Sequence, residues 1–150
     1  MSLSILCGAV DLFGKLKRDA EALDEEVSAD RFFNFVVTGY SLIAWVRHDT
    51  TLSATAKSEV CTLRKDHWIK VCGDLATAAK HFELTDRKPI PESTEMQTGY
   101  GSGRYGKGGY GIGEPTINVI LKDGTIYDCL ELKAGVIASW EQFFQDYHIS

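Results

Sequence analysis

The sequence is poor in cysteine and proline and has no long apolar run, and each shortage excludes a class of protein. The four cysteines form no Cys-x-x-Cys pair, which excludes a zinc ribbon, a thioredoxin-type redox motif and a disulfide scaffold. Only three of the 150 residues are proline, so a collagen-like chain is excluded as well. No stretch reaches the roughly 18–20 apolar residues of a membrane span. The cysteines are expected to be free thiols, and Cys7 and Cys72, beside apolar neighbours, to pack as small hydrophobic residues.

An excess of positive charge is also missing. With 16 Lys and Arg against 21 Asp and Glu, the net charge is −5, so the field of the whole protein does not steer it towards nucleic acid. The opening residues 1–10 lack the basic start of a secretory signal. Together these observations predict a cytoplasmic protein with reduced cysteines and no membrane association.

The chain does contain ample core material, because 44% of its residues are hydrophobic, enough for one compact domain. Apolar residues recur on one face over about residues 10–26, which predicts an amphipathic helix. A second helix over about residues 31–48, with Ser28 or Asp30 as its start signal, is apolar almost all round and is expected at the centre. Gly39 within this helix predicts a close helix crossing.

A third periodic stretch predicts one long helix from Thr55 to about Leu84. Its apolar positions recur about every 3.5 residues, a spacing typical of a helix-bundle seam. Gly73 lies inside this stretch and is a candidate bend. Pro89 and Pro91 end helical structure beyond it.

The C-terminal part combines a glycine-rich segment, a hairpin and a helix. Residues 99–113 hold eight of the 14 glycines, which predicts a loop. Asp123-Gly124 separates two β-rich runs, and a two-residue turn there places Val119 opposite Asp128 on a mainly apolar face. A one-sided apolar stripe predicts a helix over about residues 134–147 that covers this face. Because Asp128 is buried in this register, it is expected to pair with a Lys or Arg of the bundle.

These elements predict an α+β fold that is mainly α. We expect a single domain with a three-helix core over about residues 8–85, a glycine-rich loop over about 98–114, and a hairpin and helix (ββα) over about 116–147. A lone hairpin is marginally stable in water, so the ββα unit is expected to pack on the core.

Four polar residues share one stripe of the predicted long helix, namely Arg64, His67, Asp74 and His81. Seven helical residues span about 10 Å, so His67, Asp74 and His81 cannot bind one metal ion from this helix. No motif in the chain indicates a metal site or a cofactor. Arg64 and His67 are three residues apart and are expected to meet. The stripe has two interpretations: half-buried polar residues bonded to facing helices, or a site in which His81, His67 and Arg64 act on a substrate.

The glycine-rich segment carries cations interleaved with aromatic rings. Cations beside stacking faces are typical of single-stranded nucleic-acid binding. A flexible linker and a protein-binding segment are the alternatives. The Gly-x-Gly-x-x-Gly pattern at residues 101–106 precedes a strand instead of following one, so it does not indicate a dinucleotide site. The candidate binding residues of the segment are Tyr100, Arg104, Tyr105, Lys107 and Tyr110.

Several segments resemble an uncharacterised bacterial and phage-associated family: Asp74-Leu-Ala-Thr-Ala-Ala-Lys-His-Phe-Glu-Leu84, the second helix rich in Trp and Phe, and Trp140-Glu-Gln-Phe-Phe144 after the Asp-Gly hairpin. That family is in turn similar to HEPN domains, small helical bundles of defence and toxin systems, many of which are RNases. The HEPN-like part covers about residues 10–84. Catalytic HEPN members carry an Arg and a His separated by four to six residues on one helix. Here Arg64 and His67 are closer together, and no Arg precedes His81 at that spacing.

The interpretation that the sequence favours is a small interaction or regulatory module of a bacterial or phage conflict system, without a cofactor. It would act through its hairpin edge, its glycine-rich loop or a self-association face, with a protein partner or as a homodimer. The alternative is a HEPN-like RNA-binding or RNA-cleaving effector, with Arg64, His67 and His81 at its site and the glycine-rich loop contacting nucleic acid.

Overall fold

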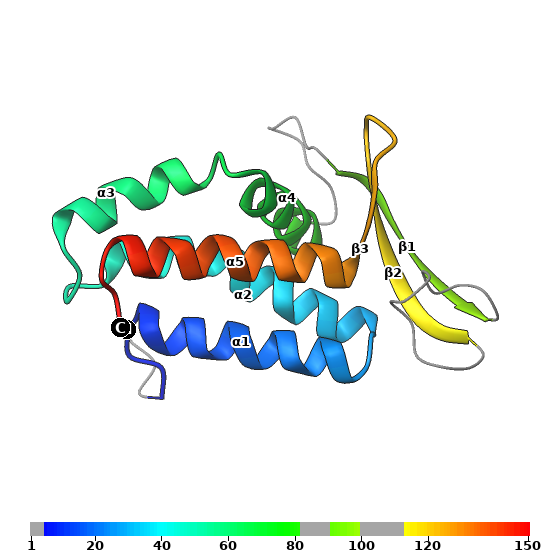
Figure 1. Ribbon diagram of the computed structural model, residues 1–150, viewed down its shortest axis with the longest axis horizontal. Coiled ribbons are helices and arrows are strands. Elements are labelled where there is room, and N and C mark those ends of the chain that lie inside the picture. The colour runs from blue at the N-terminus through cyan, green and yellow to red at the C-terminus, as the bar shows by residue number, and fades with distance from the viewer. Residues whose placement is uncertain (1–4, 82–90, 100–112) are drawn as a thin grey trace.

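A computed structural model describes residues 5–81, 91–99 and 113–150. Within these ranges the chain forms five helices and one antiparallel sheet, so the fold is α+β and mainly α, as predicted. Helices α1, α2 and α5 run roughly along one direction, α4 crosses them, and the sheet lies at the end of the bundle where α5 begins (Figure 1). None of the helices in the described ranges combines the length and apolar character needed to cross a bilayer. The helices are α1 (Ala9–Glu25), α2 (Ala29–His48), α3 (Ala54–Leu63), α4 (His67–His81) and α5 (Cys129–Asp146).

The first two helices match their predicted ranges to within two residues. Ser28 caps α2, because its Oγ accepts a hydrogen bond of 3.1 Å from the backbone N–H of Arg31. Helix α2 contacts all four other helices and is central as predicted, although part of its surface is exposed to solvent. Gly39 is the predicted close crossing: a Cβ there would lie 3.1 Å from Sγ of Cys72 on α4 and 3.3 Å from Cγ1 of Val136 on α5.

The start of α1 is capped by a residue from the end of α2. Gly8 has no side chain to cap the helix, and the carboxylate of Asp49 accepts the N–H of Ala9 instead, at 2.9 Å. A Cβ at Gly8 would lie 2.8 Å from that carboxylate oxygen, so the approach requires glycine. Burial of Asp49 favours its neutral form, but hydrogen bonds from Thr51 and from Ala9 outweigh burial and lower the pKa of Asp49.

The prediction of one long helix over residues 55–84 is wrong, because the helix is divided at residues 64–66. The cause is Asp66, whose carboxylate accepts the N–H groups of Trp68 and Ile69 at 3.1 and 3.2 Å and so starts α4 afresh. The same oxygen accepts the hydroxyl of Ser139 on α5 at 2.9 Å. Asp66 therefore begins one helix and anchors a second.

The sheet has the order β1-β2-β3, with β1 (Pro91–Gly99), β2 (Gly113–Leu121) and β3 (Ile126–Asp128). Strand β1 was not predicted, since most of it was assigned to no element and its end to the glycine-rich loop. It pairs antiparallel with β2, so that Gly99 lies opposite Gly113. Ile117, Val119 and Leu121 of β2 are buried, which confirms an apolar face on this strand.

The predicted hairpin register is wrong by one residue. Val119 pairs with Tyr127 and not with Asp128, and the N–H of Leu121 bonds to the carbonyl of Thr125 at 2.8 Å. The connection is a three-residue loop whose last residue, Gly124, has a φ of +91°. Three-residue hairpin loops typically contain a residue in this left-handed region, and the one additional loop residue shifts the strand register by one.

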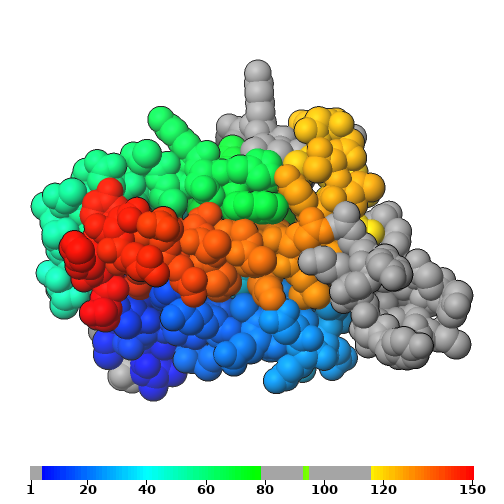
Figure 2. Space-filling model, in the orientation of Figure 1, coloured from blue at the N-terminus to red at the C-terminus, as the bar shows by residue number. Residues whose placement is uncertain are grey.

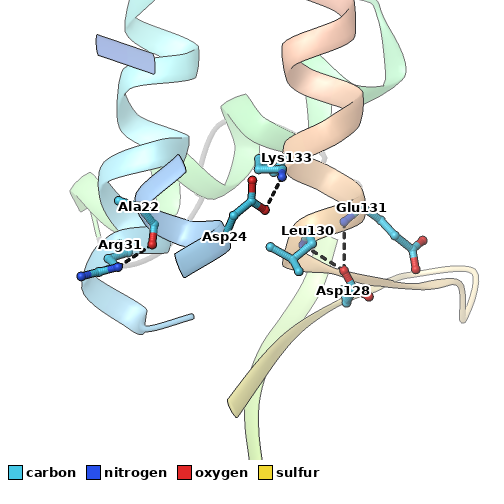
Figure 3. Close-up of polar contacts among 7 residues, drawn as sticks. All are labelled: Ala22, Asp24, Arg31, Asp128, Leu130, Glu131 and Lys133. Atoms are coloured by element: carbon cyan, nitrogen blue, oxygen red, sulfur yellow. Dashed lines mark hydrogen bonds and ion pairs between the residues drawn. The ribbon is translucent and has the colours of Figure 1, made fainter. Parts of the chain in front are cut away.

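Helix α5 begins at Cys129, five residues before its predicted start, because Asp128 caps it. The buried Asp128 carboxylate accepts the N–H groups of Leu130 and Glu131, both at 2.9 Å (Figure 3). The donors of a helix N-terminus thus bond to this buried carboxylate, a role that the sequence did not predict for it. The nearby Lys133 forms an ion pair with Asp24 and so fastens α5 to α1 (Figure 3).

All four cysteines are free thiols, as predicted. Cys72 and Cys129 are buried, and burial raises the pKa of Cys72 to about 12 and that of Cys129 to about 11. Cys7 is exposed, so its predicted packing in the core is wrong. It precedes the first helix, where its neighbour Leu6 packs against the core and Ile5 is exposed.

Candidate binding grooves beside the α3–α4 junction

The structure does not place the predicted Arg64, His67 and His81 together on one helix. Arg64 directly follows α3, and His67 is the first residue of α4. Nε2 of His67 lies 3.0 Å from the hydroxyl of Tyr127, and its ring contacts the rings of Tyr127 and Trp68. His81 is the last residue of α4, and its side chain lies outside the described part. His67 is thus a contact between α4 and the hairpin.

Of the other residues singled out in the sequence, the structure describes Asp74 but not those of the glycine-rich loop. Asp74 is buried and accepts hydrogen bonds from Lys70 at 2.8 and 3.1 Å, which agrees with the structural interpretation of the stripe. Within residues 5–81, 91–99 and 113–150, no three His, Cys, Asp or Glu residues cluster as metal ligands would. The loop residues Tyr100, Arg104, Tyr105, Lys107 and Tyr110 lie outside the described residues.

Two hollows flank the α3–α4 junction, and the first lies between α3 and α5. We call it the acidic groove. It has a volume of about 720 Å³. The green surface of α3 and α4 lies along the orange and red surface of α5 on the face shown in Figure 2. The groove is lined by Glu59, Thr62, Leu63, Lys65, Asp66, Trp68, Gly135, Ala138, Ser139, Gln142, Phe143, Asp146 and Tyr147.

Aromatic rings stand at both ends of the acidic groove. At one end the Trp68 ring is seated on the backbone of α5, since a Cβ at Gly135 would lie only 2.2 Å from that ring. At the other end the rings of Phe143 and Tyr147 pack 4.8 Å apart. Gly135 and Tyr147 are twelve residues apart in sequence, which corresponds to about 18 Å along the helix. Small residues such as Ala138 and Ser139 line the stretch between the two ends.

Negative charge prevails in the acidic groove. Three carboxylates line it (Glu59, Asp66 and Asp146), against one cation, Lys65. Burial raises the pKa of Tyr147, and the negative charges of Glu59 and Asp146 raise it further. The carboxylate of Asp66 already accepts hydrogen bonds from the start of α4 and from the hydroxyl of Ser139. Glu59 and Asp146 are exposed, and their charges face the solvent of the groove.

The second hollow, which we call the basic groove, lies between α2 and α4 beside Arg64. It consists of two cavities of about 430 and 630 Å³ that share Tyr40 and Arg64. No Asp or Glu lines either cavity, and neither includes His67. The smaller cavity is lined by Phe33, Val37, Tyr40, Ser41, Ile43, Ala44, Arg64, Ala76 and Thr77, and the larger by Tyr40, Arg64, Lys65, Ile69 and Lys70.

The basic groove has a fixed aromatic ring between its two cavities. The Tyr40 ring is seated on α4, because a Cβ at Gly73 would lie 2.6 Å from its Cε1. Gly73, predicted as a bend, thus provides room for this ring. Lys70 is held by Asp74, whereas the exposed Arg64 guanidinium has no hydrogen-bond or ion-pair partner among the described residues.

The sequence did not predict that two aromatic rings pack on helix glycines, Trp68 on Gly135 and Tyr40 on Gly73. Trp68 was assigned to a helix seam and Tyr40 to the core, although each lies beside a groove. The available signal was the pair of glycines inside helical patterns, Gly73 and Gly135, because a glycine there costs helix stability and often indicates a close approach. The sequence did not show which ring each glycine meets.

Comparisons with known proteins place the chain in no group. No family model matches it, and neither a curated protein nor a solved structure is significantly similar to it. The resemblance to HEPN domains therefore stays a prediction.

Proposed function

We propose that this protein is a binding module that receives a positively charged segment of a partner protein in the acidic groove. The observation that carries the proposal is the lining of the groove, in which three carboxylates face one cation between two aromatic ends. Binding to a protein partner was the interpretation that the sequence favoured. The groove supplies a surface for it.

The size of the groove favours a peptide segment. A length of about 18 Å matches three turns of helix. Aromatic side chains are enriched among the residues that dominate binding energy at interfaces, and here Trp68 and Tyr147 are partly exposed. The short side chains of Ala138 and Ser139 leave room for an approaching backbone.

The negative charges of the acidic groove favour a positively charged segment. Glu59 and Asp146 are exposed at the rim, where opposite charges on a partner increase the association rate and reject wrong partners. A segment rich in Lys or Arg on one side and in aliphatic residues on the other meets both features of the groove. We propose binding and not RNA cleavage, because Arg64 and His67 line no common cavity among those described above.

The test uses two synthetic twelve-residue amphipathic peptides, one of Leu and Lys and one of Leu and Glu. We expect the Lys peptide to bind, to change the tryptophan fluorescence of the protein, to which Trp68 contributes, and to bind more weakly as salt rises. The double variant Glu59→Gln/Asp146→Asn should weaken this binding about tenfold, since each rim charge contributes about 0.5–1 kcal/mol. The matched control is Glu21→Gln/Glu141→Gln, which removes two exposed carboxylates outside the groove.

Equal binding of the two peptides, or an equal loss in the control variant, would contradict the proposal. Sedimentation of the protein alone provides a second check. A dimer that dissociates in the Glu59→Gln/Asp146→Asn variant would show that a second copy fills the groove, and the proposed partner would then be wrong.

A further inference from the structure

We propose that the basic groove is a nucleotide-binding site. The phosphate would lie at the cavity of Arg64, Lys65 and Lys70, and the base in the cavity beside Phe33. This inference rests on other residues than the proposed function, apart from Lys65, which lines both grooves. Either proposal can therefore fail alone.

The cationic end fits a phosphate group. Arg64, Lys65 and Lys70 line one cavity that contains no carboxylate. The nearby Asp74 is already bound to Lys70, so the positive charge of Arg64 and Lys65 is not neutralised within the described part. A guanidinium presents several N–H donors in a plane and binds phosphate oxygens in pairs.

The apolar end fits a base. Phe33 is 47% exposed, an unusual position for a large apolar side chain, and it lines the smaller cavity with Val37, Ala44 and Ala76. The hydroxyl of Ser41 lies in the same lining and offers a hydrogen-bonding group, whereas that of Thr77 already donates to the carbonyl of Gly73 at 2.8 Å. Bases bind to aromatic and apolar faces of this kind without strong sequence preference.

Tyr40 and Arg64 join the two ends, because both residues line both cavities. The Tyr40 ring is held on Gly73, so the junction is formed before a ligand arrives. Cavities of about 430 and 630 Å³ lie within the size range of small-molecule sites. A ligand that is anionic at one end and flat and apolar at the other fills the groove better than an acidic peptide, which lacks the flat end.

The experiment measures binding of three probes to the full chain by calorimetry: adenosine monophosphate, adenosine and inorganic phosphate. We expect adenosine monophosphate to bind more tightly than either part alone. Arg64→Gln should weaken adenosine monophosphate and phosphate about tenfold and leave adenosine unchanged, because a hydrogen bond to a charged group is lost. Phe33→Ser should weaken adenosine monophosphate and adenosine and leave phosphate unchanged.

Two controls keep the result specific. Arg47→Gln removes an exposed arginine that lines neither groove, and it should change nothing. Both Phe33 and Arg64 are exposed, so their variants should keep the helical circular-dichroism spectrum of the parent. Adenosine monophosphate that fails to bind at millimolar concentration would overturn the proposal. So would an equal loss of all three probes in Arg64→Gln, or tighter binding of an acidic Glu peptide at the same groove.

Discussion

The two grooves on either side of the α3–α4 junction share one construction and differ in charge. Each has an aromatic ring seated on a helix glycine, Trp68 on Gly135 in the acidic groove and Tyr40 on Gly73 in the basic groove. Three carboxylates line the first, whereas three cations and no carboxylate line the second. The same type of packing thus occurs in two surfaces of opposite charge.

The difference shows that net charge is a poor guide to local chemistry. A net charge of −5 predicts that the whole protein repels nucleic acid at long range. Charges in solution act over about 8–10 Å at ordinary salt, however, so each groove is governed by the groups that line it. Lys65 lines both grooves, so its charge contributes to the electrostatic potential of each.

The largest expected effect is a loss of stability when the two glycines that contact aromatic rings, Gly135 and Gly73, are replaced. Gly135→Ala would place a methyl 2.2 Å from the Trp68 ring, and Gly73→Ala would place one 2.6 Å from the Tyr40 ring. Overpacking costs about 1–3 kcal/mol, and the better helix propensity of alanine returns up to about 1 kcal/mol. We expect Gly135→Ala to lower the free energy of unfolding by about 1–2 kcal/mol and Gly73→Ala by less, as measured by urea denaturation.

The matched control for this pair is Gly14→Ala in α1. A Cβ there meets only the end of the flexible Arg18 side chain, at 3.4 Å, so the variant should be more stable than the parent by about 0.5–1 kcal/mol. Gly135→Ala should also weaken binding of the Lys peptide and leave adenosine monophosphate unchanged. If Gly135→Ala were as stable as Gly14→Ala, the Trp68 ring could not lie on α5 as described.

A smaller effect is expected from Lys65→Glu, which should act on the two grooves in opposite directions. Reversing this exposed charge should strengthen binding of the Lys peptide about threefold and weaken binding of adenosine monophosphate about threefold. Titrations of both ligands at low salt measure the two changes. Lys122→Glu, an equal reversal in the exposed hairpin loop, should change neither. Changes in the same direction at both grooves would show that the charge contrast does not determine what they bind.

The smallest effect concerns the titration of Tyr147. Burial and the charges of Glu59 and Asp146 raise its pKa, so Glu59→Gln/Asp146→Asn should lower that pKa part of the way towards its ordinary value. Because the folded state favours the neutral phenol, the stability that Tyr147 contributes is lost as pH rises through its pKa. Ring-labelled tyrosine followed by NMR across alkaline pH measures the change. An unchanged pKa would place the two carboxylates too far from the phenol to define an acidic groove.

Local signals predicted the elements whose contacts are local. Helices α1 and α2 follow from apolar periodicity, and the cap at Ser28 from its residue type. The break before α4 was missed although Asp66 is a good N-cap residue, because the apolar spacing continues across it. Strand β1 was missed because its polar sequence has no alternation, and its pairing with β2 is decided by residues far away in sequence.

The grooves could not be predicted from local signals. Arg64 was named as a candidate, but with His67 as its partner on one continuous helix, and the division of that helix removes the pairing. Tyr40, Trp68 and Phe33 acquire their roles only when α2, α4 and α5 pack together. The turn glycine, Gly124, shows the same limit on a smaller scale: the Asp-Gly pair predicts a hairpin, but its backbone conformation decides the register.

The cap that Asp49 provides for α1 also bears on the order in which the chain assembles. Helices α1 and α2 form a hairpin fastened at the open end by Asp49 and at the turn by Arg31, which donates to the carbonyl of Ala22 (Figure 3). The contact at the turn joins residues only nine apart in sequence, and the hairpin closes from there to the cap at Asp49; contacts close in sequence form early in folding. We expect the hairpin to be structured in the transition state and α3, α4 and α5 to dock later. Substitutions in the acidic groove, which is lined by α3, α4, α5 and the α3–α4 junction, would then mainly change the unfolding rate. Substitutions of the α2 residues that line the basic groove would also slow folding.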